Sequence, residues 1–323
     1  MRRGRLRPAT AGQAGICLLM LVGLAAIGAP WLAPNSPDRS FPDRLYAPPG
    51  GYAYAQRLVS RLERRFEDDR SQPVSLQWFT DGRLVTVPEA GGGPLLLLGA
   101  DAFGRDTFSR LLYGARASLA LALVATAVAL LLGALVGGAA RFAGGWVDEA
   151  LSRFTDFVLV LPAIYVALAL RAVMPLVLPP ATVFALLTLI FALVGWPIVA
   201  RGMRTIIASE REREYVAAGL AIGATRWRLL SRHLLPAASG YLAVQATLLL
   251  PAFILAEATL SYVGLGFPDS VPTWGTMLQD AANMSLVAEA PWMLAPAAAI
   301  FLVVLGVNLV VQGTGRPPVQ LEP

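Results

Sequence analysis

The chain has 323 residues, of which 56% are hydrophobic and 15% charged, and its mean hydropathy is +0.60. This composition is too apolar for a soluble globular protein and indicates a membrane protein. The formal net charge is +5, and all 26 basic residues are arginine. We interpret these arginines as markers of membrane topology and do not expect nucleic-acid binding.

Six segments are long and apolar enough to be membrane helices. A helix needs about 20 mostly apolar residues to cross a bilayer, because lipid offers no partners for unpaired backbone groups. In chain order the segments are 16–33, 118–140, 157–170, 181–200, 238–262 and 290–312, the third being the shortest. The first resembles a cleavable signal peptide, but Pro30 directly follows the candidate cleavage site, so we expect an uncleaved anchor. The sequence therefore predicts an all-α polytopic membrane protein.

The distribution of arginine predicts the orientation. Four arginines precede the first span, two lie in residues 141–156 and seven in residues 201–236. Cytoplasmic loops carry an excess of basic residues, so these three regions are expected to be cytoplasmic. Six spans then leave both termini in the cytoplasm, including a tail at 313–323.

Residues 1–34 are expected to form the cytoplasmic N-terminus and the first span. Residues 35–98 follow as a polar stretch, expected on the opposite side of the membrane. Leu58, Leu62 and Phe66 recur every four residues, which predicts an amphipathic helix. Further on, apolar and polar residues alternate on both sides of Asp81-Gly82, which predicts a β-hairpin. We therefore expect a small α+β extracytoplasmic insertion.

The cytoplasmic stretch 201–236 has the pattern of a helix-turn-helix. Ser209 and Glu212 fit a capping box that would start a helix ending near Ile222. Gly223 would supply a left-handed turn, and Thr225 would cap a second helix. On that helix Trp227, Leu230 and Leu234 share one face, and Pro236 closes it before the fifth span.

This stretch resembles the docking loop of ABC importer permeases. The family pattern is Glu-Ala-Ala, three residues, Gly, nine residues, an apolar residue, any residue, then Leu-Pro. The spacing matches, although Ala217 replaces the family's Glu, Gly219 its second Ala and His233 the apolar residue; Glu214, one turn earlier, is expected to take over a charged contact. The resemblance implies that the loop binds a separate ATP-binding subunit. The expected contact residues are Glu214, Ala217, Ala218, Gly219, Gly223, Ala224, His233, Leu235 and Pro236. The alternative is an ordinary amphipathic cytoplasmic loop.

Two further segments, 99–119 and 257–278, resemble the second permease of the dipeptide and oligopeptide importers, a group that also contains nickel permeases. The three matches cover most of residues 99–312, which would form the permease core with five spans. They imply the type I ABC importer permease fold with six transmembrane helices, in a bacterial inner membrane. The implied cargo is peptides or similar small solutes. The implied partners are a homologous second permease, two ATP-binding subunits and an extracytoplasmic solute-binding protein, besides membrane lipid. The insertion at 35–98 would either contact the binding protein or only stabilise the outer loops.

The segment before the second span is expected to be an interfacial helix. Asp106 can accept N–H groups at its start, while Phe108, Leu111 and Leu112 would face lipid. Arg105, Arg110 and Arg116 would then lie at headgroup level.

Glu257 is a carboxylate within an apolar run, which costs roughly 2.5–3.5 kcal/mol at mid-bilayer and points to a functional or structural partner. We expect Glu257 and Ser261 either to line the translocation pathway or to hold neighbouring polar groups in place.

No catalytic residues, metal ligands or cofactor site are expected. Because the chain has no lysine, a GxxxxGK[ST] phosphate loop is impossible, and the single histidine has no partners at metal-ligand spacing. ATP hydrolysis is therefore expected on partner subunits. The alternative function is a stand-alone secondary transporter or channel, which would need coupling-ion sites within its spans.

Overall fold

The computed structural model describes residues 8–60, 64–88, 93–173, 175, 178–282 and 288–314. These residues pack as two compact units, one formed by the chain up to Leu119 together with the part from Glu257, the other by Ala120–Ala256. The described part is mostly helical, as predicted, and five of its helices are long and apolar enough to cross a membrane. The expected cytoplasmic residues 1–7 and 315–323 lie outside the described residues.

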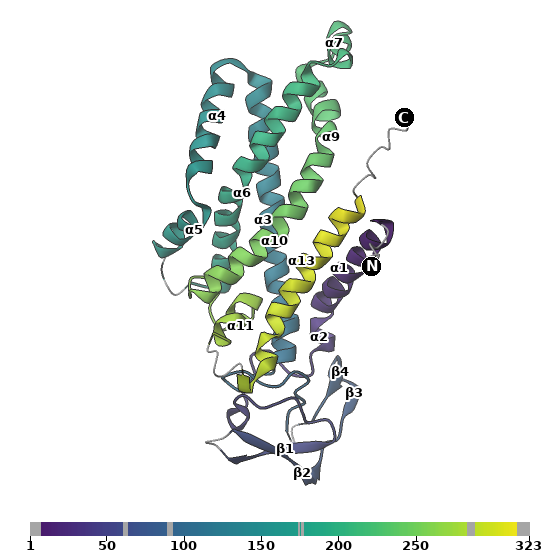
Figure 1. Ribbon diagram of the computed structural model, residues 1–323, viewed down its shortest axis with the longest axis vertical. Helices are drawn as coiled ribbons and strands as arrows, with labels where there is room; N and C mark the ends of the chain where they lie inside the picture. The colour runs from purple at the N-terminus through teal and green to yellow at the C-terminus, as the bar shows by residue number, and fades with distance from the viewer. Residues whose placement is uncertain are drawn as a thin grey trace, which may run out of the picture. The chain divides into compact units, whose positions relative to one another are not determined.

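The first unit is built on a helix pair (Figure 1). It contains α1 (Pro8–Ile27), α2 (Ala29–Leu32), the start of α3 (Thr107–Ala143), the end of α10 (Ser239–Tyr262), α11 (Trp274–Asp280), the short η3 (Pro291–Leu294) and α13 (Ala295–Thr314). Helices α1 and α13 pack side by side. A Cβ atom on Gly15 would lie only 2.5 Å from the carbonyl oxygen of Gly306. Small residues thus let the two backbones approach closely, as is typical of membrane helices.

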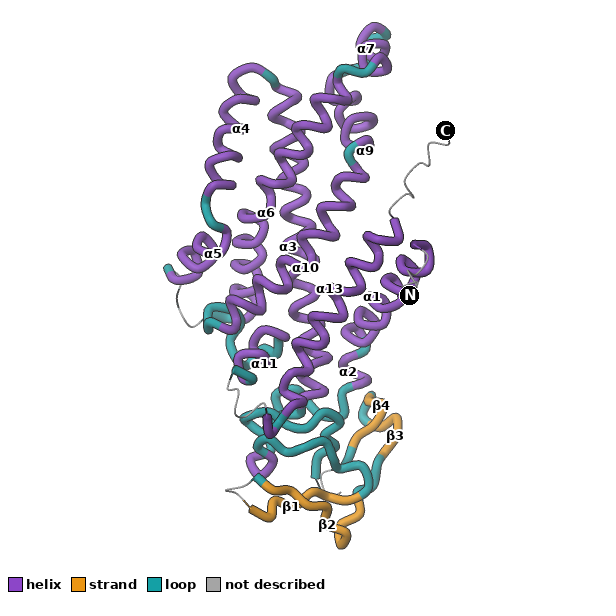
Figure 2. The backbone as a smooth tube through the Cα atoms, in the orientation of Figure 1, coloured by secondary structure: helices purple, strands orange, loops and turns teal. Residues whose placement is uncertain are grey.

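The insertion at 35–98, expected on the outer side of the membrane and called the outer insertion below, contains in its described residues two β-hairpins, which Figure 2 shows in orange, and η1 (Pro42–Arg44). Strands β3 (Gln77–Thr80) and β4 (Arg83–Thr86) confirm the hairpin predicted around Asp81-Gly82. The predicted amphipathic helix is wrong, because β1 (Tyr54–Ser60) pairs antiparallel with β2 (Arg65–Pro73) and Leu58 lies opposite Phe66. Leu62 lies outside the described residues.

The second unit contains the rest of α3, α4 (Gly145–Val160), α5 (Ala163–Ala172), α6 (Pro180–Arg211) and most of α10. Gly133 and Gly137 lie one turn apart on α3, where a Cβ on Gly137 would lie 2.3 Å from the carbonyl oxygen of Ala200 on α6. The third predicted span is not one continuous helix, because Leu161-Pro162 separates α4 from α5. Proline lacks the N–H that would continue the helix, and the residue before it favours an extended backbone.

The start of α3 differs from the interfacial helix that was predicted there. Thr107 begins a helix of 37 residues that continues into the second span. Asp106 accepts hydrogen bonds from the backbone N–H of Phe108 and the hydroxyl of Ser109, which confirms its role at the helix start. Leu112, however, packs against Ala29 and Ala33 and is buried, so it does not face lipid.

Two arginines predicted at headgroup level are buried in a network of charges. Arg105 pairs with Asp101 at 2.7 Å, Asp269 at 2.9 Å and Asp280 at 3.2 Å. Arg110 lies 3.5 Å from Asp101. The network fixes the start of α3 to the loop before it and to α11, a pairing between distant segments that local sequence spacing could not show.

Candidate functional site

The docking segment, residues 209–237, begins differently from its prediction. Ser209 lies inside α6, which continues to Arg211, so the predicted capping box at Ser209 and Glu212 is wrong. The chain turns at Glu212 and Arg213, and α7 (Glu214–Ala221) follows. The amides of Glu212 and Arg213 bond to the carbonyl oxygens of Ser209 and Glu210, at 3.3 and 3.2 Å, which closes the turn between the helices.

The glycine turn after α7 is confirmed. Gly223 has φ of +83°, in the left-handed region that favours glycine. The N–H of Ala224 bonds to the carbonyl oxygen of Gly219 at 3.0 Å, the six-to-one bond of a Schellman motif. Thr225 then caps α8 (Arg226–Leu229), accepting the N–H of Arg228 on its hydroxyl at 3.3 Å. The side chain of Trp227, predicted to share a face with Leu230 and Leu234, lies outside the described part of the structure.

A π-helical turn, η2 (Leu230–Leu234), connects α8 to α9 (Leu235–Ala237) and was not predicted. The wider turn precedes Pro236, whose ring has no N–H and would crowd the carbonyl of residue 232 in a regular α-helix. The backbone from Leu229 to Ala238 thus stays helical through Pro236, which does not end the helix as predicted.

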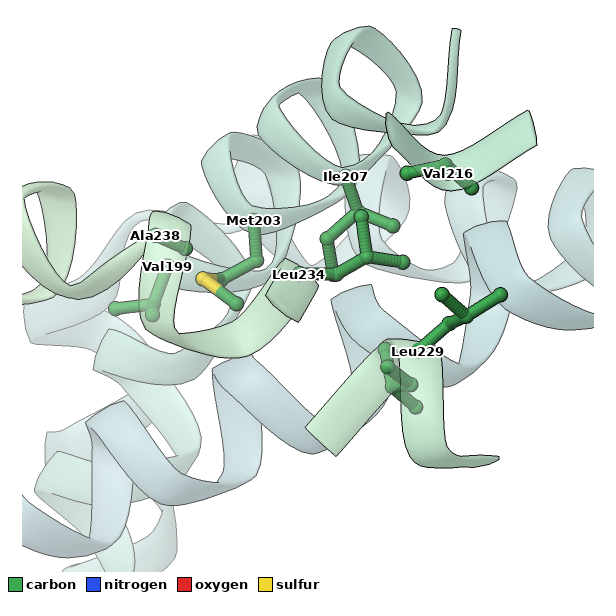
Figure 3. Close-up of a cluster of buried hydrophobic side chains, with 8 residues drawn as sticks. Val199, Met203, Ile207, Val216, Leu229, Leu234 and Ala238 are labelled. Atoms are coloured by element: carbon green, nitrogen blue, oxygen red, sulfur yellow. The ribbon is translucent and has the colours of Figure 1, made fainter. Parts of the chain in front are cut away.

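The docking segment is fastened to α6 by a buried apolar cluster, drawn in Figure 3. Val216 from α7 and Leu229, Leu230 and Leu234 from the second helical stretch contribute to it; Val199, Met203 and Ile207 of α6 and Ala238 complete it. All eight side chains are buried. Helix α7 and the second helical stretch of the docking segment are thus packed directly on α6.

The predicted contact residues divide between an outer surface and the packing beneath it. Glu214, Ala217, Ala218, Gly223, His233 and Pro236 are exposed, whereas Gly219, Ala224 and Leu235 are half-buried. Ile222, the residue after α7, is 87% exposed although apolar. The exposed part of α7 thus combines the small side chains of Ala217 and Ala218, which permit the close approach of another protein, with the carboxylate of Glu214.

Gly219, which departs from the family pattern, packs against Leu229. A Cβ atom at Gly219 would lie 2.9 Å from the end of the Leu229 side chain. The glycine lets α7 approach the following helix closely. Local packing therefore explains why this position has glycine where the family pattern has alanine.

Sequence reasoning missed two contacts of Tyr215, one with the His233 ring and one with Glu210. The Tyr215 ring lies 6.0 Å from the His233 ring, and its hydroxyl donates to Glu210 at 2.8 Å. Burial and the adjacent Glu210 raise the pKa of Tyr215. The i,i+5 spacing of Glu210 and Tyr215 across a helix break is no recognised sequence signal, so only the structure reveals the contact.

A second missed group ties α4 to α6. Asp148 is buried and accepts two hydrogen bonds from Arg204, at 2.6 and 3.0 Å, and one from Arg141 at 3.3 Å. Arg141 and Arg204 were counted in the sequence only as topology markers.

The two candidate pathway residues are buried in the first unit. Glu257 is 0% exposed and accepts the hydroxyls of Ser118 at 3.0 Å and Ser261 at 2.8 Å. Ser118 also accepts the backbone N–H of Trp274 at 3.1 Å. These bonds agree with the structural alternative, and contact of Glu257 and Ser261 with cargo stays a prediction.

Comparison with known proteins shows that this chain is similar in sequence to components of membrane transport systems. Residues 129–314 match the family model described as "Binding-protein-dependent transport system inner membrane component". The dipeptide transport system permease protein DppC of Alkalihalophilus pseudofirmus is 39% identical over 216 residues, covering 67% of this chain and 68% of the relative. The di/tripeptide transport system permease protein DppC of Pseudomonas aeruginosa is 32% identical over 300 residues, covering 93% and 84%. The oligopeptide transport system permease protein OppC of Bacillus subtilis is 36% identical over 218 residues, covering 67% and 68%.

Proposed function

The chain belongs to the family of inner membrane components of binding-protein-dependent transport systems, and we propose that it forms half of the translocation pathway for peptides. In this proposal, a separate ATPase supplies the energy for transport. It is a permease subunit of an ABC importer of the dipeptide and oligopeptide type. The proposed cargo is short peptides or similar small solutes, by analogy with the relatives' names.

The proposed topology has six spans and both termini in the cytoplasm. Five spans are the long apolar helices, and the sixth is the broken pair α4 and α5, whose two parts together are long enough to cross. The arginines of 201–236 then lie on the cytoplasmic side, where the docking segment can reach a soluble ATPase.

The docking segment is the observation that carries this proposal. Its outer surface of Ala217, Ala218 and Ile222 is exposed, while Val216 on the same helix is buried in the cluster on α6. One short helix therefore has a face for a partner and a face for the membrane domain. A self-contained secondary transporter has no use for such an element, and no observation favours that alternative.

The proposed mechanism is alternating access. Two ATP-binding subunits close on ATP and push the docking segments of this chain and of a homologous permease, and the buried cluster carries the displacement into α6. Shifting a two-state equilibrium from 1:99 to 99:1 takes about 5.5 kcal/mol of differential binding, which two ATP-dependent interfaces can supply.

The test is purification of the tagged chain from its native membrane in mild detergent, followed by mass spectrometry of the proteins recovered with it. Wild type should recover an ATP-binding subunit and a second permease. Gly223→Val should lose the ATPase, because valine is strained at φ of +83°, and should keep the second permease. Gly223→Asn is the matched control and should retain both, since asparagine tolerates this conformation. Recovery of the chain alone from wild-type membranes would contradict the proposal.

The binding protein is proposed to contact the outer insertion. The β1 and β2 hairpin exposes charged side chains, among them Arg65, Glu67 and Asp68, which suit a soluble partner. Deleting residues 54–73 should then reduce delivery of cargo by the binding protein. Unchanged delivery and uptake would leave the hairpin with a role only in stabilising the outer loops.

A further inference from the structure

The second hairpin of the insertion holds two large aromatic side chains away from the protein. Trp78 is 60% exposed and Phe79 is 80% exposed, although both lie in strand β3. Phe79 has φ of +56°, a left-handed conformation that is unfavourable for an aromatic residue. A strained backbone that presents an apolar ring to the exterior points to a partner for that ring.

The hairpin is fastened to the end of a membrane helix. Strand β4 packs against α2, which follows α1 after the single residue Gly28. The guanidinium of Arg83 donates to the carbonyl oxygen of Pro34 at 2.9 Å, just beyond α2. Figure 1 shows β3 and β4 beside α2 at the end of α1. The hairpin is therefore held beside the end of α1, where the proposed topology has the chain leave the bilayer.

Trp31 on α2 is a third large aromatic residue with an exposed side chain in this part of the chain. It is 61% exposed, whereas its neighbours Ala29 and Ala33 are buried against the start of α3. Tryptophan and other aromatic rings concentrate at the membrane–water interface, where an apolar body meets a wet surface.

We propose that Trp31, Trp78 and Phe79 form an aromatic anchor that inserts the β3 and β4 hairpin into the headgroup region of the phospholipid bilayer around α1. The partner is lipid because the hairpin is fastened beside α2 at the end of α1, and because strand β3, which carries the two exposed rings, has no charged residue. Strand β2 differs, since Arg65, Glu67 and Asp68 would be costly to desolvate there. The anchor thus fixes the depth and tilt of the insertion. The proposal rests on the proposed topology only for the choice of leaflet.

A fluorescence quenching experiment on the full chain tests the anchor. Cys17 is the only cysteine, so a Cys17→Ser background accepts a single label at Leu84→Cys, on the strand β4 that pairs with β3, or at Gln72→Cys on β2 as the control. The proteins are reconstituted in nanodiscs of phosphatidylethanolamine and phosphatidylglycerol, with nitroxide-labelled phospholipid or aqueous iodide as quencher. The label at position 84 should be quenched by the nitroxide lipid, and the label at position 72 by iodide.

Further variants distinguish insertion by the aromatic rings from insertion by the label itself. Trp78→Ser combined with Phe79→Ser should transfer the quenching at position 84 from lipid to iodide, while Tyr54→Ser should leave it unchanged. Equal iodide quenching at positions 84 and 72 would overturn the proposal. Protection of position 84 from both quenchers would also overturn it, because a protein would then cover the hairpin.

Discussion

Ser118 donates a hydrogen bond to Glu257 over 3.0 Å, which joins the beginning of α3 to the end of α10 within the first unit. The same hydroxyl accepts the backbone N–H of Trp274, the first residue of α11. Gly275 makes room for the arrangement, because a Cβ there would lie 2.9 Å from a carboxylate oxygen of Glu257. Helix α3 thus meets α10 and α11, which are distant from it in sequence, at one buried carboxylate.

Replacing Glu257 by alanine should destabilise the protein. The hydroxyls of Ser118 and Ser261 would lose their acceptor in a buried site, and each unsatisfied group costs about 1–3 kcal/mol. Thermal unfolding in detergent without cargo should show a lower Tm for Glu257→Ala, and a smaller decrease for Glu257→Gln, which keeps a carbonyl oxygen. A wild-type Tm for Glu257→Ala, together with lost uptake, would instead favour a role in the pathway.

Two adjacent glycines on α3 should respond oppositely to alanine. At Gly137 the added Cβ would lie 2.3 Å from the backbone of Ala200, which cannot move aside easily, so we expect a loss of about 1–3 kcal/mol from overpacking. At Gly138 the nearest atom is 3.6 Å away, an ordinary contact, and alanine favours the helix. Denaturant unfolding in detergent should therefore show Gly137→Ala destabilised and Gly138→Ala at or above wild-type stability. Equal stabilities would contradict the close packing of α3 on α6.

Asp280 should make stability depend on pH. Burial, and then the neighbouring Asp101 and Asp269, raise its pKa from 3.8 to about 6. The folded state holds this proton more tightly than the unfolded state, so the contribution of Asp280 to stability falls as pH rises from 3.8 to about 6. Asparagine at position 280 has no carboxyl proton to lose, so the stability of Asp280→Asn should not fall in this way. The Tm of the variant minus the Tm of wild type should therefore increase as pH rises from 4 to 7. A difference in Tm that stays constant across this range would count against the raised pKa.

The sequence predicted local features of the docking segment better than its contacts. Glycine favours the left-handed turn at position 223, and threonine favours the cap position at 225, so both predictions were correct. The predicted start of the first docking helix was wrong because Ser209 and Glu212, which fit a capping box, lie at the end of α6, where Ser209 is inside the helix and Glu212 follows its last residue. The buried cluster joins Val216 to Met203 and other distant residues, which spacing along the chain does not reveal.

The outer insertion shows a second limit of pattern reasoning. Leu58 and Phe66 share a helix face at a spacing of eight residues, but they also fit opposite positions of a hairpin, which is where the structure places them. The hairpin at Asp81-Gly82 was predictable because both turn residues need positive φ, which Asp and Gly accept and which a two-residue turn requires. Network partners such as Asp101 and Asp280 were not predictable, since tertiary packing alone brings them together.

The central claim, that α7 binds an ATP-hydrolysing subunit, is tested most directly by site-specific crosslinking. Cys17→Ser removes the only cysteine, and Ala218→Cys then places a thiol on the exposed part of α7, with Gln72→Cys in the outer insertion as the control. In native membranes, a thiol-to-amine crosslinker should join position 218 to an ATP-binding polypeptide, with a yield that changes when ATP is added. Position 72 should give no such product. Absence of an ATP-binding polypeptide from the products at position 218, in a variant that keeps wild-type uptake, would contradict the claim.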